Sequence, residues 1–429
     1  MMAKRILIRF GDMMLKGQNI GFFIKRIRMH IKHKLSDLDV SFLLRHDRIM
    51  IDYHESDEQT IIDRLKDIQG IHDFSVAYLC EPHLDDITKT AIMVLDQEIQ
   101  KDGTTLKIET RRTNKAFPMT SIAITQTVAK PIIEGTKWHV KVDVNHPDET
   151  LHIDLRLEAA YIYLKSIKGM GGYPYGTGGK ALLMMSGGLD SPVCAYLAMK
   201  QGLDVELIHF ESSPLTPLES VQKVIDLSIK LARYTFDDMI TLHVVPFKHI
   251  HEQILSSIFE PYMITIMRRM MYRISERWAI KKSMHALISG DSVGQVASQT
   301  LPSLRVVESV TKLPVLRPVI TYDKLEIIQL AKQIETYDIS IRPFQDCCSL
   351  YLPKQPVTKP MNIYCEKYES AIDFEPMLTQ AIQSIMTLRL HKDDRITLAS
   401  YGLDALEALT TYRLEKSESI DHLQTKQDI

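Results

Sequence analysis

One apolar run and the polar loop behind it constrain the fold more than any other stretch of the chain. The run from Ala181 to Met185 shows no alternation, which predicts a strand buried on both faces. Ser186-Gly187-Gly188 follows at once, and its two glycines let backbone N–H groups surround an oxyanion. Pro192 suits the first turn of a helix, which we expect over 193–201, before a second apolar run at 205–210. This βαβ unit directs a helix N-terminus at whatever the loop binds.

The loop lacks the Gly-Lys-Ser/Thr of a Walker A motif and the glycine spacing of a Rossmann motif. With its strand and helix, Ser186-Gly187-Gly188-x-Asp190-Ser191 resembles the pyrophosphate loop (PP-loop) of the N-type ATP pyrophosphatases. That resemblance implies cleavage of ATP to AMP and pyrophosphate, usually with adenylation of an oxygen of the acceptor. A glycine-rich turn that binds nothing is the alternative interpretation.

Length and composition describe a large soluble protein. The 429 residues exceed a single ordinary core, so we expect two or three domains. Apolar residues make up 45% and charged residues 25% of the chain, and no run of eighteen apolar residues could span a membrane. The five cysteines are too few and too scattered for a disulfide framework or a zinc site, so we assign no metal ligands and expect a reducing cytoplasm.

Positive charge is concentrated at the start of the chain. The first fifty residues hold eleven basic and four acidic side chains, although the whole chain carries a net charge of only −2. We expect a helix from Asn19 to about Leu35, with a basic stripe beside its apolar stripe. The basic stripe is a candidate phosphate-contacting surface, formed by Lys25, Arg28 and Lys32, with Lys16 ahead of it. A solvated helix face is the alternative.

Residues 70–165 predict a second small α+β unit with a basic turn. Arg111, Arg112 and Lys115 lie close to Phe117, and cations beside an aromatic ring are typical of single-strand RNA binders. An exposed basic hairpin without function is the alternative. A Gly- and Pro-rich stretch at 169–179 then marks a domain boundary.

Beyond this boundary, strands alternate with helices, which predicts an α/β domain with a doubly wound parallel sheet and a ligand at the carboxyl ends of its strands. A methionine stripe on the helix expected over 261–282 reads as core, and the neighbouring Arg268 and Arg269 are candidates for nucleotide phosphates. The chain becomes polar after residue 392, and we expect 416–429 to be disordered.

Adjacent cysteines in a Pro-flanked loop carry a second piece of chemistry. Cys347 and Cys348 follow the last clear helix, and neighbouring cysteines rarely bond to each other because the peptide between them would be strained. At least one is therefore expected to be a free thiol, suited to nucleophilic or sulfur-carrying work. Two buried structural cysteines are the alternative.

Several motifs together resemble the ThiI family of tRNA 4-thiouridine synthetases, over about residues 4–370. They are Phe10-Gly11-Asp12…Lys16-Gly17-x-Asn19, Glu109-Thr110-Arg111-Arg112-x-Asn114-Lys115-x-Phe117-Pro118, Tyr175-Gly176-Thr177-Gly178-Gly179-Lys180, the PP-loop, Gly294-Gln295-Val296-Ala297-Ser298-Gln299-Thr300, Val315-Leu316-Arg317-Pro318 and Asp346-Cys347-Cys348. The resemblance implies a ferredoxin-like domain at 1–68, a THUMP RNA-binding domain at 69–168, a PP-loop pyrophosphatase domain at 169–392 and an extension at 393–429. The chain departs from the longer family pattern in one respect, since we expect no rhodanese-like domain after residue 370.

The same resemblance implies the reaction. ATP adenylates O4 of a uridine, at position 8 of tRNA, and a persulfide on Cys348 then replaces AMP with sulfur. Asp190 lies by the pyrophosphate and its Mg²⁺, Lys324 stabilises the departing pyrophosphate, and Cys347 relays or resolves. The ATP site is implied to comprise Met184, Met185, Ser186, Gly187, Gly188, Asp190, Ser191, His209, Phe210, Arg268, Gly290 and Gln299. A cysteine desulfurase is implied as sulfur donor. Some relatives also supply sulfur to thiamine thiazole synthesis, which is not expected here without a rhodanese domain. The sequence does not determine the oligomeric state, and a homodimer is one option.

Two rival functions stay open from the sequence. One is an amidating PP-loop synthetase that adenylates a small carboxylate, which leaves the first 165 residues unexplained. The other is a tRNA-binding module without catalysis, against which the intact loop from Ser186 to Ser191 argues.

Overall fold

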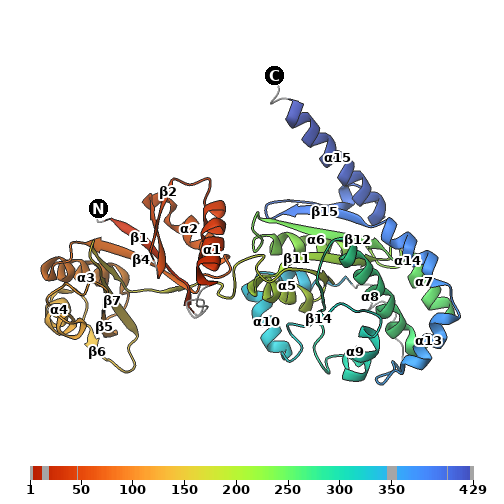
Figure 1. The fold of residues 1–429 in the computed structure, drawn as a ribbon, viewed down its shortest axis with the longest axis horizontal. Helices are drawn as coiled ribbons and strands as arrows, with labels where there is room; N and C mark the ends of the chain where they lie inside the picture. Colours follow the sequence, from red (N-terminus) through yellow and green to blue (C-terminus); the bar gives the residue numbers. More distant parts are fainter. Residues whose placement is uncertain (1–2, 12–18, 46, 345–354, 403, 426–429) are drawn as a thin grey trace. The chain divides into compact units, whose positions relative to one another are not determined.

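The computed structural model describes residues 3–11, 19–45, 47–344, 355–402 and 404–425, with side chains up to residue 415. The chain divides into a first unit, Met1–Pro174, and a second unit, Tyr175–Ile429 (Figure 1). Among the described residues, no helix has the length and apolar character needed to cross a membrane.

The first unit begins with a ferredoxin-like arrangement. Its elements are β1 (Lys4–Arg9), α1 (Ile20–Lys34), β2 (Val40–Leu44), β3 (Arg48–Tyr53), the 3₁₀ helix η3 (Glu55–Asp57), α2 (Glu58–Lys66) and β4 (Asp73–Cys80). The strands form the antiparallel order β2-β3-β1-β4. Alternate residues of β1, Ile6 and Ile8, share a core with Ile27 and Ile31 of α1, which confirms the apolar stripe predicted for this helix.

The rest of the first unit extends the same sheet. Its elements are α3 (Leu84–Glu98), β5 (Thr105–Arg112), α4 (Ser121–Gly135), β6 (Lys141–Val142), β7 (Glu149–Leu155), β8 (Ala160–Tyr163) and β9 (Ile167–Lys168). Because β4 pairs with β8 as well as with β1, nine strands join in one sheet, in the order β2-β3-β1-β4-β8-β7-β5-β6 with β9 on β4. The expected boundary at 68/69 precedes β4, a strand that both small domains share.

Ion pairs cross between the two halves of this sheet on the face opposite α1. Arg48 of β3 is buried and pairs with Asp154 of β7 at 2.5 Å, and Arg156 pairs with Asp47 at 2.8 Å. Arg5 of β1 donates to the Tyr161 hydroxyl of β8 at 2.9 Å. These bonds join β1 and the β3 region to β7 and β8.

The second unit is a three-layer α/β domain. Its strands are β10 (Lys180–Met184), β11 (Asp204–Glu211), β12 (Met239–Pro246), β13 (Ala286–Ile288), β14 (Val315–Leu316) and β15 (Met386–His391). Its helices are α5 (Asp190–Lys200), α6 (Leu218–Ala232), α7 (Lys248–Ser257), η4 (Glu260–Tyr262), α8 (Met263–Lys281), η5 (Ala297–Gln299), α9 (Leu301–Glu308), α10 (Lys324–Gln333), α11 (Tyr337–Ser340), α13 (Asn362–Ser370), α14 (Phe374–Gln383), η6 (Leu398–Ser400) and α15 (Ala405–Thr425).

The sheet order is β14-β13-β10-β11-β12-β15. The first five strands are parallel, as predicted, and β15 is an antiparallel edge strand that the sequence analysis missed. One face packs on α7, α8, α13 and α14, where Met267, Met270 and Met271 are buried in the core, as expected for the methionine stripe. The other face packs on α5 and α6 (Figure 1).

The C-terminal segment differs from the prediction. Disorder was expected from Lys416, but α15 continues to Thr425. Its first turns carry the buried residues Ala405, Ala408, Leu409 and Tyr412, whose spacing of three and four is that of an amphipathic helix. The prediction relied on the scarcity of apolar residues after Lys416, whereas the helix begins earlier, on residues that do pack, and continues past that point.

Candidate active site

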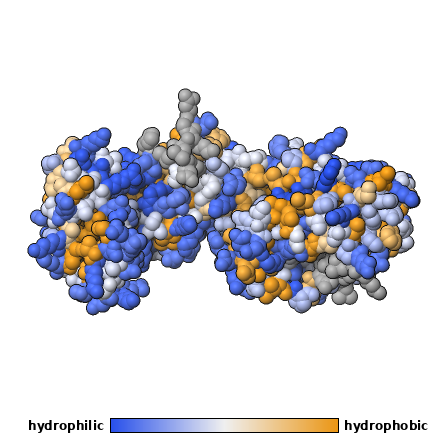
Figure 2. Space-filling view, turned by 90° about the horizontal axis from the view of Figure 1, so that it is seen from below, coloured by the Kyte–Doolittle hydropathy of each residue, from blue (hydrophilic) through white to orange (hydrophobic). Residues whose placement is uncertain are grey.

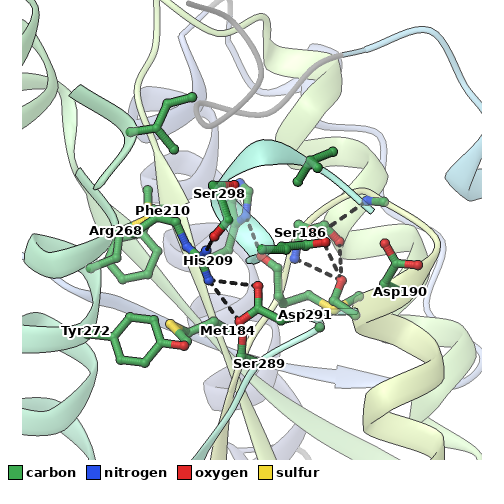
Figure 3. Close-up of a pocket in the computed structure, with 18 of the residues that line it drawn as sticks. Met184, Ser186, Asp190, His209, Phe210, Arg268, Tyr272, Ser289, Asp291 and Ser298 are labelled. Carbon is green, nitrogen blue, oxygen red and sulfur yellow. Dashed lines mark hydrogen bonds and ion pairs between the residues drawn. The ribbon is translucent and has the colours of Figure 1, made fainter. Parts of the chain in front are cut away.

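A pocket of about 410 Å³ opens at the carboxyl ends of β10, β11 and β13, where ligands bind in folds of this type. Its lining residues come from the PP-loop, the ends of those strands, α8 and the segment around η5 (Figure 3). They are Met184, Met185, Ser186, Gly188, Asp190, Ser191, His209, Phe210, Ile264, Arg268, Met271, Tyr272, Ser289, Gly290, Asp291, Val296, Ala297, Ser298, Gln299 and Pro356.

The hydroxyl of Ser191 holds the PP-loop in shape. It accepts a hydrogen bond from the Ser186 backbone N–H at 3.0 Å and donates to the Ser186 carbonyl at 2.9 Å. The Ser186 hydroxyl in turn accepts from the Gly188 N–H at 3.3 Å. Ser191 is therefore a staple between the loop and the first turn of α5, so the helix N-terminus stays directed at the pocket.

Gly290 permits a close backbone approach. A Cβ at this position would lie 3.1 Å from the backbone nitrogen of Ser191 and 3.3 Å from the carbonyl carbon of Asp190. The chain leaving β13 therefore passes directly over the start of α5, where only a glycine fits without displacement.

A buried carboxylate between two arginines forms the floor of the pocket. Asp291 accepts from Arg268 at 2.7 and 2.9 Å, from Arg317 at 3.4 Å and from the Ser289 hydroxyl at 2.7 Å (Figure 3). Burial alone would raise the pKa of Asp291, but the charges of Arg268 and Arg317 and the hydrogen bond from Ser289 hold it below its usual value. Asp291 is thus a fixed anion that orients Arg268 along the pocket wall.

Charged groups also meet at the pocket mouth. Asp190, the first residue of α5, accepts from Lys324 at 3.1 Å and from the Gln295 amide at 3.2 Å. Lys324 is the first residue of α10, and Asp323 and Glu326 form a capping box there. Two helix N-termini and an ammonium group therefore converge on one place, an arrangement suited to polyphosphate.

The other end of the pocket is suited to a base. Met184, Phe210, Ile264 and Met271 supply apolar wall, and the Oε1 atom of Gln299 is buried without a hydrogen-bond partner among the described residues. A buried amide oxygen of this kind costs free energy until it accepts a bond, for example from an exocyclic amino group. His209 is fixed at the strand end by its Nδ1–H, which donates to the Met185 carbonyl at 3.0 Å.

Most of the predicted ATP residues lie together. Eleven of the twelve line the pocket, and only Gly187 of the loop is not among the lining residues. Arg269 was wrongly considered for phosphate contact: it is buried away from the pocket and bonds to Glu369, Val306 and Ser309. Cys347, Cys348 and Lys16 lie outside the described residues.

The described chain on both sides of the cysteine segment touches the site. On the entry side, the Ser340 hydroxyl donates to the Gly188 carbonyl of the PP-loop at 3.2 Å. On the exit side, Pro356 lines the pocket, and the Thr358 carbonyl accepts from Thr300 at 2.5 Å. The last described residues before the cysteine segment and the first ones after it therefore both contact the site.

The predicted tRNA contacts stay predictions. Lys25, Lys32, Arg111 and Lys115 are exposed, and the face of the first unit in Figure 2 is largely hydrophilic. Arg112 has a local role, because its guanidinium donates to the carbonyls of Phe117 at 2.7 Å and Met119 at 3.0 Å and so holds the basic turn. Arg28 is half-buried on α1.

The comparisons with known proteins fit this geometry. A "Probable tRNA sulfurtransferase" from Acholeplasma laidlawii is 49% identical over 414 residues, which are 96% of this chain and 100% of that protein. The chain belongs to the ThiI family. The ThiI model, described as a thiamine biosynthesis protein, matches residues 176–374, the ThiI ferredoxin-like domain matches 5–75, and the THUMP domain matches 81–165.

Solved structures agree with the ThiI assignment. The crystal structure of a 4-thiouridine synthetase–RNA complex with bound ATP is 32% identical, with a TM-score of 0.81 over 91% of this chain and 100% of that chain. A protein from Pyrococcus horikoshii, 21% identical with a TM-score of 0.59 over 77% of this chain and 99% of that one, shares the fold.

Sequence reasoning missed four polar residues of this ThiI site. Ser289, Asp291, Gln295 and Arg317 received no role, although Gln295 and Arg317 belong to motifs that the sequence analysis quoted. Position after a buried strand was the available signal for Ser289 and Asp291, since both follow β13 at the carboxyl edge of the sheet.

Proposed function

We propose that this protein transfers sulfur to tRNA in an ATP-dependent reaction, adenylating O4 of a uridine and replacing it with sulfur to give 4-thiouridine. The observation that carries the proposal is the pocket itself. Its apolar end holds the Gln299 amide oxygen, which has no partner among the described residues, and leads to a PP-loop, where Asp190 and Lys324 meet. The THUMP domain and the relatives' names support tRNA as the substrate.

The proposal includes one orientation of ATP in the pocket. The adenine lies between Phe210 and the methionines, where Gln299 accepts a hydrogen bond from its amino group. The phosphates lie on the PP-loop N–H groups at the start of α5, with Arg268 alongside. The proposed ATP ligands are thus the predicted set, with Ser191 acting through the loop rather than on the nucleotide.

Mg²⁺ suits the mouth of this site, because Asp190 supplies a carboxylate and the ATP phosphates supply further oxygens. The ion would neutralise phosphate charge. No group of three His, Cys, Asp or Glu side chains in the described ranges is arranged to hold a metal by itself. Metal binding is therefore expected to need the nucleotide.

The reaction proceeds in two steps. The uridine O4 attacks the α-phosphorus, pyrophosphate leaves beside Lys324, and the base carries AMP on O4. The terminal sulfur of a persulfide on Cys348 then attacks C4 and expels AMP, since an adenylated oxygen is a good leaving group and a persulfide a strong nucleophile. A second thiol cleaves the sulfur–sulfur bond, leaving 4-thiouridine and a disulfide to Cys348. The thiol of a partner forms this disulfide without strain, whereas Cys347 would form a strained bond to its neighbour.

Further features belong to the same proposal. A cysteine desulfurase is the proposed source of the persulfide sulfur. Uridine 8 is the proposed target, the cytoplasm the proposed compartment, and a homodimer the proposed assembly.

Nucleoside analysis tests the function directly. tRNA from a strain lacking this protein should lose 4-thiouridine by mass spectrometry, and Asp190→Ala should fail to restore it while keeping tRNA affinity. Unchanged 4-thiouridine in the deletion strain would reject the function. Pyrophosphate release driven by small carboxylic acids without tRNA would favour an amidating synthetase instead.

Cys348→Ser should abolish thiolation, and Cys347→Ser should keep at least part of it. The reverse pattern would move the persulfide to Cys347. Thiolation retained by both variants would reject the persulfide step.

A further inference from the structure

A buried lysine holds the chain just before the cysteine segment. Lys223 of α6 is 4% exposed, and its ammonium donates to the carbonyl oxygens of Arg342 at 3.0 Å and Phe344 at 3.4 Å. Phe344 is the last described residue before 345–354. Burial of an ammonium group is costly unless its hydrogen bonds are specific, so this contact fixes both carbonyls in space.

The same short segment has three more ties. The Phe344 N–H donates back to the Arg342 carbonyl at 2.9 Å, which closes a tight turn across Pro343. The Arg342 guanidinium pairs with Asp226, one turn along α6 from Lys223. Ser340 donates to the Gly188 carbonyl of the PP-loop. Residues 340–344 are therefore fastened both to α6 and to the nucleotide loop.

We propose that Lys223 is a positioning residue for the sulfur-transfer step, setting where the cysteine segment departs relative to the PP-loop. This inference rests on the proposed function, in which a persulfide must meet the adenylated base. Such a step depends steeply on orientation, and a misplacement of about 1 Å can cost on the order of 100-fold in rate. Adenylation needs only the pocket, which Lys223 does not line.

Lys223→Met tests the inference because it keeps the length of the side chain and removes the donor. With tRNA present, we expect pyrophosphate release within about 3-fold of wild type and single-turnover thiolation from preloaded persulfide reduced ~30- to 100-fold. Lys230→Met is the matched control on the same helix. Lys230 is partly exposed and pairs with Glu335 at 2.8 Å, and its replacement should leave both steps unchanged.

Inorganic sulfide separates positioning from general damage. As a small nucleophile, sulfide attacks C4 directly and expels AMP without the cysteine segment, so millimolar sulfide should restore 4-thiouridine in Lys223→Met as in Cys348→Ser. Should Lys223→Met fail to fold, Asp226→Asn replaces it. That variant loosens the Arg342 tie at the surface and should slow the same step, by a smaller factor.

The outcomes are distinct. Equal loss of pyrophosphate release and thiolation, absence of rescue by sulfide, or full thiolation in both variants would each overturn the role of Lys223. Persulfide-dependent thiolation retained by both Cys348→Ser and Cys347→Ser would instead overturn the proposed function on which the inference rests.

Discussion

Replacing Gly290 by alanine probes the contact between the sheet edge and the PP-loop. The new methyl group would lie 3.1 Å from the Ser191 nitrogen and 3.3 Å from two further backbone atoms, all in the first turn of α5. Backbone cannot move aside as a flexible side chain can. The start of α5 must therefore shift by a few tenths of an ångström, together with the staple that Ser191 makes to Ser186.

The expected cost follows from this crowding. Forcing one methyl group into a well-packed site typically costs 1–3 kcal/mol, so we expect a loss of about 2 kcal/mol in the second unit. For a unit of this size, that corresponds to a fall of roughly 4–8 °C in Tm. Because the phosphate-binding N–H groups move with α5, the KM for ATP should rise at the same time.

Calorimetry and the ATP dependence of pyrophosphate release measure the two effects. Gly188→Ala is the control for stability: its Cβ would meet only the Ser186 hydroxyl, at an ordinary 3.4 Å, so its Tm should stay close to wild type. Gly290→Ala with unchanged Tm and unchanged KM would refute the reasoning.

Three further predictions concern other charged groups. Arg48→Ala leaves the buried Asp154 carboxylate poorly compensated, so the free energy of unfolding measured in urea should fall by about 3–5 kcal/mol. Arg45→Ala is the control, because Arg45 is exposed and its loss should change the free energy of unfolding very little. Equal losses in the two variants would contradict this reasoning. Burial would raise the pKa of Glu206, but hydrogen bonds and charge from His243 and Lys180 lower it to about 2. The ionised Glu206 therefore stabilises the fold fully above the pKa that it has in the unfolded chain, and this stabilisation disappears as the pH falls towards 2. Glu206→Gln should flatten the stability profile below about pH 4.5, and an unaltered profile would remove the assignment. Lys324→Ala should slow tRNA-dependent pyrophosphate release ~100-fold or more. Lys332→Ala, on the same helix, is the control and should leave the rate unchanged. Similar rates for the two variants would show that Lys324 does not act on the leaving group.

Local sequence patterns predicted the parts of the molecule that depend on neighbouring residues. The strand at 181–185, its loop and the helix after it were predictable because polarity changes there within one residue. Eleven pocket residues followed from that loop and from family motifs. Arg268 and Arg269 show the limit of such reasoning: adjacent residues on α8 point about 100° apart, so only one reaches the pocket.

Features that depend on distant partners were not predictable. β15 is a short strand whose neighbour, β12, lies about 150 residues earlier, and no local pattern announces that pairing. Asp291 becomes a stable buried anion only because Arg268 and Arg317 arrive from two other elements. The hydrogen bonds from Lys223 to the segment 342–344 could likewise not be predicted from the sequence, because they require α6 to pack beside a segment more than a hundred residues later.

The strand β4 has a consequence for how this architecture can be inherited. Because it is hydrogen-bonded to β1 on one side and to β8 on the other, neither small domain has a complete edge without its neighbour. A genetic exchange that cut the chain near residue 70 would leave one of the two small domains with a strand edge whose backbone groups are unpaired, and such an edge can pair with another chain. The two small domains are therefore expected to be inherited together, and to unfold in one cooperative transition rather than two.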